Sequence, residues 1–315
     1  MTEKKSFTLA HLSDPHMCSP QGLSAHALMN KRILGYLSWR LYRRTEHRKE
    51  VLAGLLSDLQ AIKLDHIVIT GDLTHLGTPS DFFRAKQFLQ SLGPPSQVTV
   101  VPGNHDAYVA VDWKHTFALW REYMASDATV QSAAENTDSR IHFPILRIRG
   151  QIALIGVSTA CPSAPLFATG RVGHIQLQKL ENILTEAGRQ GLLRVVVIHH
   201  PPVSGVVRWR KRLTDSHAFR KVLKRCGAEM VLHGHVHRSS FTQLQTPEGN
   251  APVICVSSAS ALGRNPKRRA RFHIYHFNQT EQQWKVGLTV HRYSDKKKHF
   301  VAESERQFIL CQKLR

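Results

Sequence analysis

The chain has 315 residues, 42% of them hydrophobic, and carries 43 Lys and Arg against 23 Asp and Glu, a formal net charge of +20. This length and composition suit a large folded domain and exclude a collagen-like or disordered chain. No apolar run approaches the ~20 residues that a membrane span needs, and the polar residues 1–6 do not predict a signal peptide. The positive charge favours an anionic partner: a phosphorylated substrate, an acidic membrane surface or nucleic acid.

Two kinds of segment alternate along the chain. Short apolar, β-branched runs are typical of buried strands, and apolar residues at the 3.6-residue period are typical of helices. Their alternation favours an α/β fold with one domain over residues 1–315. Strands are expected at residues 7–12, 66–70, 98–101, 152–157, 195–199, 230–233 and 253–256. Helices are expected at about residues 46–63, 79–92, 174–187 and 216–226, a loop at 125–138 and a C-terminal β-hairpin at 272–291.

Polar motifs follow five of these strands, where each strand ends. They are DPH at 14–16, GDLTH at 71–75, GNHD at 103–106, HHPP at 199–202 and HGHVH at 233–237. Open α/β sheets bind their ligands beyond the carboxyl ends of the strands. Because buried polar side chains without compensation are destabilising, five such clusters indicate a site rather than a structural role.

The chemistry of these motifs predicts a metal centre. Two carboxylates, one amide and four imidazoles form a mixed ligand set that suits Mn, Fe or Zn. Seven ligands are too many for one tetrahedral ion. A bridging carboxylate divides them between two ions, which is the arrangement that stabilises in-line displacement at phosphorus.

The five motifs, in this order, closely resemble the calcineurin-like metallophosphoesterases over about residues 7–260. The resemblance implies a four-layer αββα sandwich of two mixed sheets flanked by helices. It also implies two divalent ions, and manganese is the metal that we expect first, with iron and zinc as alternatives. By this resemblance one ion is held by Asp14, His16 and His237, the second by Asn104, His199 and His235, and Asp72 bridges the two.

The expected reaction is hydrolysis of a phosphoester or phosphoanhydride bond. Two cations lower the pKa of a bridging water, so that hydroxide attacks phosphorus in line while Asp72 holds both ions. His105 matches the family histidine that contacts the scissile phosphate and assists the leaving group. We choose His199 over His200 as the ligand, because it continues the inward alternation of Val195 and Val197.

Five further residues are candidates for substrate contact or for support of the ligands. Asp106 is a candidate hydrogen-bond partner of His105, with a structural role as the alternative. Two arginines belong to the basic run 208–212, which follows the HHPP motif and could reach the mouth of the site. The five candidates are His75, Asp106, His200, Arg208 and Arg210.

Residues 23–45 form a basic helical insertion. Its Ile33, Leu34, Leu37 and Leu41 share one arc of a helix, and basic and aromatic residues surround them. This pattern is typical of a helix that lies on an anionic membrane surface, and a cap helix packed on the core is the alternative.

The sequence is compatible with three hypotheses for the substrate. The insertion favours a membrane-associated nucleotide-lipid such as UDP-2,3-diacylglucosamine, hydrolysed at the inner face of the membrane. The alternatives are a soluble cyclic nucleotide or glycerophosphodiester, and a nucleic acid, which the protein would bind or cleave. The complete ligand set argues against a pure binding role. The oligomeric state is left open.

Cysteine usage favours a cytoplasmic location. The five cysteines are odd in number and contain no CxxC pair, so they predict neither a disulfide framework nor a cysteine zinc knuckle. A reducing compartment therefore fits best. The cysteines are Cys18, Cys161, Cys226, Cys255 and Cys311.

Overall fold

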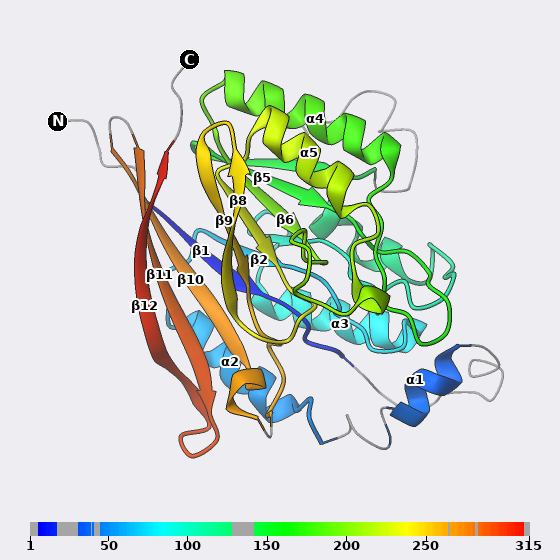
Figure 1. Ribbon diagram of the computed structural model, residues 1–315. Helices are drawn as coiled ribbons and strands as arrows, with labels where there is room; N and C mark the ends of the chain where they lie inside the picture. The colour runs from blue at the N-terminus through cyan, green and yellow to red at the C-terminus, as the bar shows by residue number, and fades with distance from the viewer. Residues whose placement is uncertain are drawn as a thin grey trace.

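The computed structural model describes residues 6–17, 31–38, 40, 45–127, 142–263, 265–280 and 283–311. Two six-stranded sheets pack face to face, and helices cover their outer faces (Figure 1). One sheet has the order β12-β11-β10-β1-β2-β3 and the other has the order β4-β5-β6-β7-β9-β8. Each sheet combines parallel and antiparallel pairs. The expected four-layer αββα sandwich is confirmed.

The elements have the following bounds. The first sheet contains β1 Ser6–Leu12, β2 His66–Ile69, β3 Val98–Val100, β10 Arg271–Gln279, β11 Gln283–Ser294 and β12 His299–Cys311. The second contains β4 Ile145–Arg149, β5 Ile152–Val157, β6 Leu193–Ile198, β7 Met230–His233, β8 Ser240–Thr246 and β9 Gly249–Cys255. The α-helices are α1 Arg32–Ser38, α2 Lys49–Gln60, α3 Pro79–Leu92, α4 His174–Arg189 and α5 Ser216–Cys226.

Three apolar cores separate the four layers. Successive side chains of a strand point to opposite faces of the sheet, so each inner strand serves two cores. On β6, Val195 and Val197 pack between the sheets, while Val196 and Ile198 pack beneath α4 and α5. The third core lies between the first sheet and helices α2 and α3. Buried apolar residues on both faces explain why these strands read as continuous hydrophobic runs.

All seven expected strands and all four expected helices are present. Strands β4, β8 and β12 were not predicted. Most of β12 is exposed, and pairing with β11 holds it in the sheet, so no buried apolar face marks it in the sequence. The C-terminal hairpin therefore carries a third strand. Of the expected loop 125–138, only residues 125–127 are described, and they form neither helix nor strand.

The basic insertion contributes α1, which spans only seven residues. Ile33 is 49% exposed, Leu34 40% and Leu37 46%, so this apolar stripe faces outward. Leu41 and most of the rest of the insertion lie outside the described residues. No helix within the described ranges is long and apolar enough to cross a membrane.

The parallel pairing of β1 with β2 and of β6 with β7 brings four of the motifs to one edge of the sandwich. The chain then turns sharply after each strand. The backbone amide of Asp14 donates to the Gly71 carbonyl at 3.0 Å, and that of His16 donates to the Asp72 carbonyl at 3.1 Å. In the second sheet, the amide of Gly234 donates to the His199 carbonyl at 3.2 Å. These bonds fix the first two motifs to each other and the last two to each other.

Candidate metal centre

The backbone at this edge is strained. Seven described non-glycine residues have a positive φ, and six of them hold or line the candidate site. Such a conformation costs an ordinary residue roughly 1–2 kcal/mol, and it persists where surrounding contacts impose it, often at functional sites. The six residues are Asp14, His16, Asp72, Leu166, His235 and His237.

Glycines in the motifs allow the ligand residues to approach one another. A Cβ atom at Gly103 would clash with the carboxylate of Asp72, and a Cβ atom at Gly234 would clash with Ser13 and with the carboxylate of Asp14. The GNHD and HGHVH motifs therefore need glycine at these two positions for steric reasons.

The first predicted ligand group is brought together. Oδ1 of Asp14 lies 3.2 Å from Nε2 of His237 and 3.8 Å from Nε2 of His16, and the two imidazole nitrogens are 3.2 Å apart. Adjacent ligand atoms each about 2.1 Å from one ion lie roughly 3.0–3.4 Å apart. The spacing therefore suits a single ion between the three side chains.

The second predicted group is equally close. Nε2 of His199 lies 3.2 Å from Nδ1 of His235, 3.3 Å from Oδ1 of Asn104 and 3.3 Å from Oδ2 of Asp72. Asp72 also shares a cluster with Asp14 and His16, in which the ligand atoms lie within 4.8 Å of one another. Asp72 therefore borders both groups, as a bridging carboxylate must.

Backbone carbonyls orient three of the imidazoles. The ring nitrogen that faces away from the cluster lies 3.3 Å from the Thr74 carbonyl in His16, 2.5 Å from the Thr70 carbonyl in His199 and 2.9 Å from the Lys211 carbonyl in His235. Metal-binding histidines are commonly held in this way, since the bond fixes the tautomer and leaves the other nitrogen for the metal.

One buried atom supports the fit of a cation directly. Oδ1 of Asp14 is buried, and no residue in the described part of the chain donates a hydrogen bond to it. The other oxygen, Oδ2, accepts hydrogen bonds from the Ser13 hydroxyl at 2.6 Å and from the His235 amide at 3.0 Å. A buried carboxylate oxygen without a donor is destabilising unless a cation compensates it. The donor set therefore fits a divalent ion at Oδ1.

The charges of the second group are coupled. Burial would lower the pKa of His199, but the Asp72 carboxylate raises it to about 9. Burial would likewise raise the pKa of Asp72, whereas His199 and His105 hold it well below its usual range. A metal ion binds neutral imidazole, so metal binding at this group would compete with protonation of His199.

His105 is held beside the ligands. Its Nδ1 lies 2.6 Å from the His75 carbonyl, and its backbone amide donates to Oδ1 of Asp72 at 2.7 Å. Its ring lies 4.8 Å from that of His16 and stacks on His75 at 5.1 Å and on Tyr108 at 5.5 Å. The remaining nitrogen, Nε2, is therefore the atom of His105 that a substrate could meet.

The hydrogen bonds of Asp106 go to two loops and not to His105, which agrees with the structural alternative. Its Oδ1 accepts hydrogen bonds from the amide and hydroxyl of Thr74 at 2.8 and 3.0 Å, and its Oδ2 accepts one from the Gly103 amide at 2.9 Å. Burial and the nearby Asp72 raise the pKa of Asp106 to about 7. Asp106 thus fastens the GDLTH loop to the GNHD loop.

The geometry favours His199 over His200 as a ligand. Nδ1 of His200 lies 2.7 Å from the Thr159 hydroxyl, and its Nε2 lies 3.2 Å from the Ala168 carbonyl. Burial lowers the pKa of His200 to about 3, with a further contribution from His199. His200 thus supports the loop that contains Ala168, although its ring packs against His235 at 4.3 Å.

A cavity of about 230 Å³ opens onto both ligand groups, and part of its lining was not predicted. Lys31 and Tyr108 face it, and neither belongs to a family motif. Arg208 and Arg210 do not line it, whereas Lys211 of the same basic run does. The full lining is Lys31, Leu34, Gly35, Asp72, His75, Asn104, His105, Tyr108, Leu166, Phe167, Ala168, Lys211, His235 and His237.

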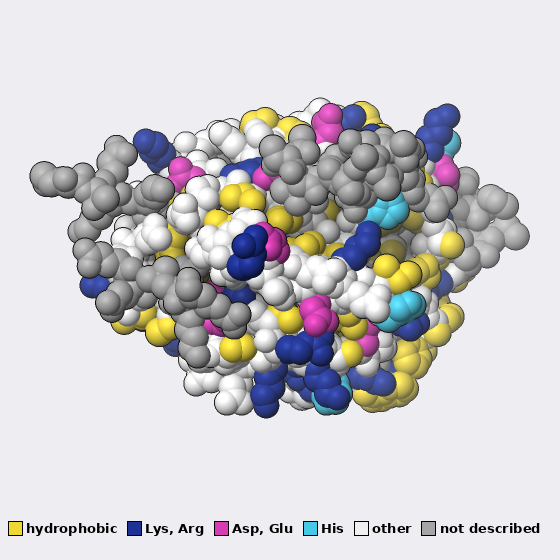
Figure 2. Space-filling model, turned by 90° about the horizontal axis from the view of Figure 1, so that it is seen from above, with side chains coloured by type: hydrophobic (Ala, Val, Ile, Leu, Met, Phe, Trp, Pro, Cys, Tyr) yellow, Lys and Arg dark blue, Asp and Glu magenta, His cyan; other side chains and the backbone are white. Residues whose placement is uncertain are grey.

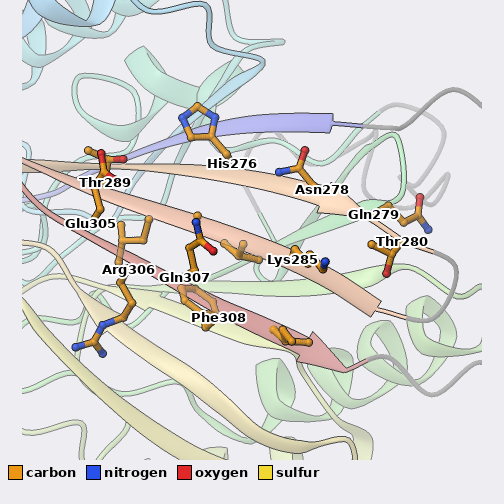
Figure 3. A pocket seen from close by; sticks show the side chains of 14 residues that line it. His276, Asn278, Gln279, Thr280, Lys285, Thr289, Glu305, Arg306, Gln307 and Phe308 are labelled. Carbon is orange, nitrogen blue, oxygen red and sulfur yellow. The ribbon is translucent and has the colours of Figure 1, made fainter.

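A larger cavity of about 1000 Å³ lies elsewhere, on strands β10, β11 and β12 (Figure 3). We call it the C-terminal trough. All four clusters of potential metal ligands found among the described residues lie at the motif edge, and none lies in the trough. On the face seen in Figure 2, the described Lys and Arg side chains form separate groups with Asp and Glu among them, not one basic surface.

Two mixed sheets with this ligand set at their strand ends define a metallophosphoesterase. The calcineurin-like phosphoesterase family matches residues 7–239, and the chain belongs to that family. It is therefore a hydrolase of phosphoester bonds, and the family implies two divalent metal ions.

Sequence relatives have names that concern cyclic nucleotides. A probable cyclic nucleotide phosphodiesterase of Vesicomyosocius okutanii is 25% identical over 228 residues, which cover 71% of this chain and 82% of that protein. A 3',5'-cyclic-nucleotide phosphodiesterase of Nostoc sp. is 24% identical over 243 residues, 76% of this chain and 74% of that protein. These names favour the soluble phosphodiesterase alternative over the nucleotide-lipid that the insertion led us to expect.

Among solved structures, a dimetal phosphatase from Danio rerio superposes with a TM-score of 0.57 at 13% identity. The match covers 97% of this chain and 99% of that one. At this identity the likeness concerns the fold alone, and it agrees with the four-layer sandwich.

Proposed function

We propose that the protein is a dimetal phosphodiesterase that hydrolyses a cyclic nucleotide. The observation that carries the proposal is the two-sided lining of the 230 Å³ cavity. One side consists of predicted metal ligands together with His105. The other contains apolar and aromatic side chains from α1, Tyr108 and the segment 166–168, and Lys31 and Lys211 also line the cavity. A phosphodiester joined to a planar base would match these two sides.

The apolar side suits a nucleobase. The Tyr108 ring continues the stack that His105 begins, and Leu34 and Leu166 add aliphatic surface beside it. Leu166 is 73% exposed and has a φ of 67°, so a large apolar residue is kept in a strained conformation at the mouth. Flat, largely apolar rings bind such surfaces well.

Lys31 holds this side of the cavity in place. Its Nζ donates to the carbonyl of Ser163 at 2.9 Å and to that of Phe167 at 3.1 Å, and it lies 4.6 Å from the centre of the Tyr108 ring. Burial lowers its pKa from the ordinary value. Lys31 thus joins α1, Tyr108 and the segment 163–167 around the proposed base site.

We infer that Asp14, His16 and His237 hold one ion, that Asn104, His199 and His235 hold the other, and that Asp72 lies between them. When bound, such ions activate water and neutralise charge on a phosphate, and we propose manganese as the first metal to test. His105 presents Nε2 to the cavity because Nδ1 is committed to the His75 carbonyl. In its protonated form it would donate to the leaving oxygen of the phosphodiester.

A nucleotide-lipid bound at a membrane surface is the second candidate. The outward-facing Ile33, Leu34 and Leu37 of α1 favour it, because exposed apolar side chains grouped at the mouth of a site can enter a lipid surface. Leu34 also lines the cavity, so an acyl chain could follow α1 outward from the phosphate.

One screen separates the two candidates. The purified protein, supplied with Mn²⁺, is assayed against 3',5'-cyclic AMP, a glycerophosphodiester, a phosphomonoester and UDP-2,3-diacylglucosamine in detergent. We expect the highest kcat/KM for the cyclic nucleotide. A preference of more than tenfold for the nucleotide-lipid would replace the first proposal with the second. Asp72→Asn in every arm controls for contaminating phosphatases.

A further inference from the structure

His47 lies beside the first ligand group, although it belongs to none of the five motifs. It precedes α2 and forms a β-bridge with Ala261, which lies about 200 residues further along the chain. Its ring centre is 4.6 Å from that of His16 and 6.1 Å from that of His237. A third imidazole therefore stands next to two predicted ligands of one ion.

The protein holds His47 in a fixed orientation. Nδ1 of His47 lies 2.7 Å from the Ser260 hydroxyl. The backbone on either side is also bound, because the Arg48 amide donates to the Ser260 carbonyl at 3.0 Å and the Leu262 amide donates to the Glu46 carbonyl at 2.7 Å. An imidazole that lies beside a ligand cluster and has a nitrogen held by the protein is a common arrangement of a metal-binding histidine.

The segment that orients His47 also orients Asp14. The Ser258 hydroxyl donates to the Asp14 carbonyl at 2.7 Å and lies 3.4 Å from the Ser260 hydroxyl. All three serines of the segment 257–260 are buried. One short, well-bonded segment thus fixes a predicted carboxylate ligand and this additional histidine relative to each other.

We propose that His47 is a further ligand of the ion that Asp14, His16 and His237 would hold. The ligand atoms of His16, His47 and His237 lie within 4.8 Å of one another. Adjacent ligands of one ion, each about 2.1 Å from it, lie roughly 3.0–3.4 Å apart, so the widest pair in this group needs to close by about 1.4–1.8 Å at most. Side-chain rotation can supply that movement.

The chemical consequence concerns which metal binds. Three imidazoles make the first site richer in nitrogen than the second, which has two imidazoles and an amide oxygen. Imidazole suits zinc, copper, iron and nickel, whereas carboxylate, carbonyl and water suit manganese, magnesium and calcium. We expect the first site to prefer the ion with the higher affinity for nitrogen ligands, and His47 to increase that preference.

The test is a titration of metal-free full-length protein with Co²⁺, followed by visible absorption and by competition with a chelator. We compare the wild type with His47→Gln, with Ser260→Ala and with His276→Gln, a matched change at an exposed histidine in the C-terminal trough. We expect His47→Gln to weaken one of the two ions at least about tenfold and to alter the cobalt spectrum. Ser260→Ala should weaken the same ion less, and His276→Gln should match the wild type.

The outcomes are distinct. Unchanged affinity and spectrum in His47→Gln, with two ions still bound, would overturn the role of His47 and leave the proposed dimetal centre intact. A wild type that binds fewer than two ions would overturn the centre on which this inference rests. A lower melting temperature of metal-free His47→Gln together with unchanged affinity for both cobalt ions would show that His47 is structural only and would overturn coordination. Ser260→Ala, which keeps the imidazole, tests the orientation of His47 if His47→Gln does not fold.

Discussion

Of the two cavities, the smaller one at the candidate metal centre has more features of a reactive site than the larger C-terminal trough. The trough is the larger, at about 1000 Å³ against about 230 Å³. The smaller cavity, however, is lined by members of all four clusters of potential ligands found in the described residues. One of these clusters contains Asp14, whose buried Oδ1 has no hydrogen-bond donor. None of the residues that line the trough has a positive φ.

This contrast shows what marks a reactive site. An open sheet face can be hollow without any energetic conflict, since its strands are relaxed and its polar groups meet water. The small cavity concentrates strained backbone and buried polar atoms whose cost only a bound group would offset. Paired substitutions, one in the cavity and the same chemical change in the trough, test the contrast.

The largest effect is expected for the change from carboxylate to amide. Asp72→Asn should lower kcat for a cyclic nucleotide by more than about 10³-fold, because an amide cannot bridge two cations. It should also lower the bound metal below two ions per chain, as measured by elemental analysis. Glu305→Gln is the same change in the trough and should leave both quantities within twofold. Equal activity of Asp72→Asn and wild type would refute the dimetal assignment.

The second largest effect is expected for the change from histidine to glutamine. His105→Gln should lower kcat by about 10²–10⁴-fold, the usual contribution of a general acid, and leave the metal content at two ions. His276→Gln in the trough should change neither. A His105 variant that loses metal together with activity would show that His105 is a ligand, contrary to the proposed role.

Tyr108→Ala tests the proposed base site. Loss of ring stacking is worth about 1–1.5 kcal/mol, so KM for the cyclic nucleotide should rise about tenfold. Turnover of a small methyl aryl phosphodiester, which lacks a nucleobase, should change much less. Ile309→Ala removes an exposed apolar side chain from the trough and should affect neither substrate. An equal loss for both substrates would place Tyr108 in support of His105 rather than of a base.

The sequence predicted the parts of the molecule whose signals are local. Strands such as β5 and β6 are buried on both faces and appear as apolar runs, and the proposed metal ligands follow strand ends in short motifs. By contrast, β12 is mostly exposed and is kept in place by pairing with β11, which leaves no periodic pattern in its own residues.

The part of the cavity lining that lies outside the five motifs could not be predicted for a related reason. Lys31, Tyr108 and Leu166 come from three distant segments, and contacts between those segments alone bring them together. No local pattern marks His47 in the sequence either, because its partner Ser260 lies more than 200 residues away. Arg208 and Arg210 do not line the cavity, whereas Lys211 of the same basic run does, and the sequence does not distinguish these three neighbouring basic residues.

The smallest expected effect concerns backbone strain. A change to glycine should raise the free energy of unfolding in the cavity and lower it in the trough. Glycine relieves roughly 1–2 kcal/mol of left-handed strain but costs about 0.5–1 kcal/mol of chain entropy. Leu166 has a φ of 67° and loses little burial, since it is already 73% exposed. Leu166→Gly should therefore raise the free energy of unfolding by about 0.5–1 kcal/mol.

Gln307→Gly, on the relaxed strand β12, has only the entropic cost and should lower the free energy of unfolding by a similar amount. Urea denaturation of metal-free protein measures both changes without interference from bound ions. If Leu166 also contacts substrate, as proposed, its glycine variant should be more stable yet show a KM raised a few-fold. A Leu166→Gly protein that is destabilised, or that keeps its KM, would show that the strain at the mouth of the cavity does not serve substrate binding.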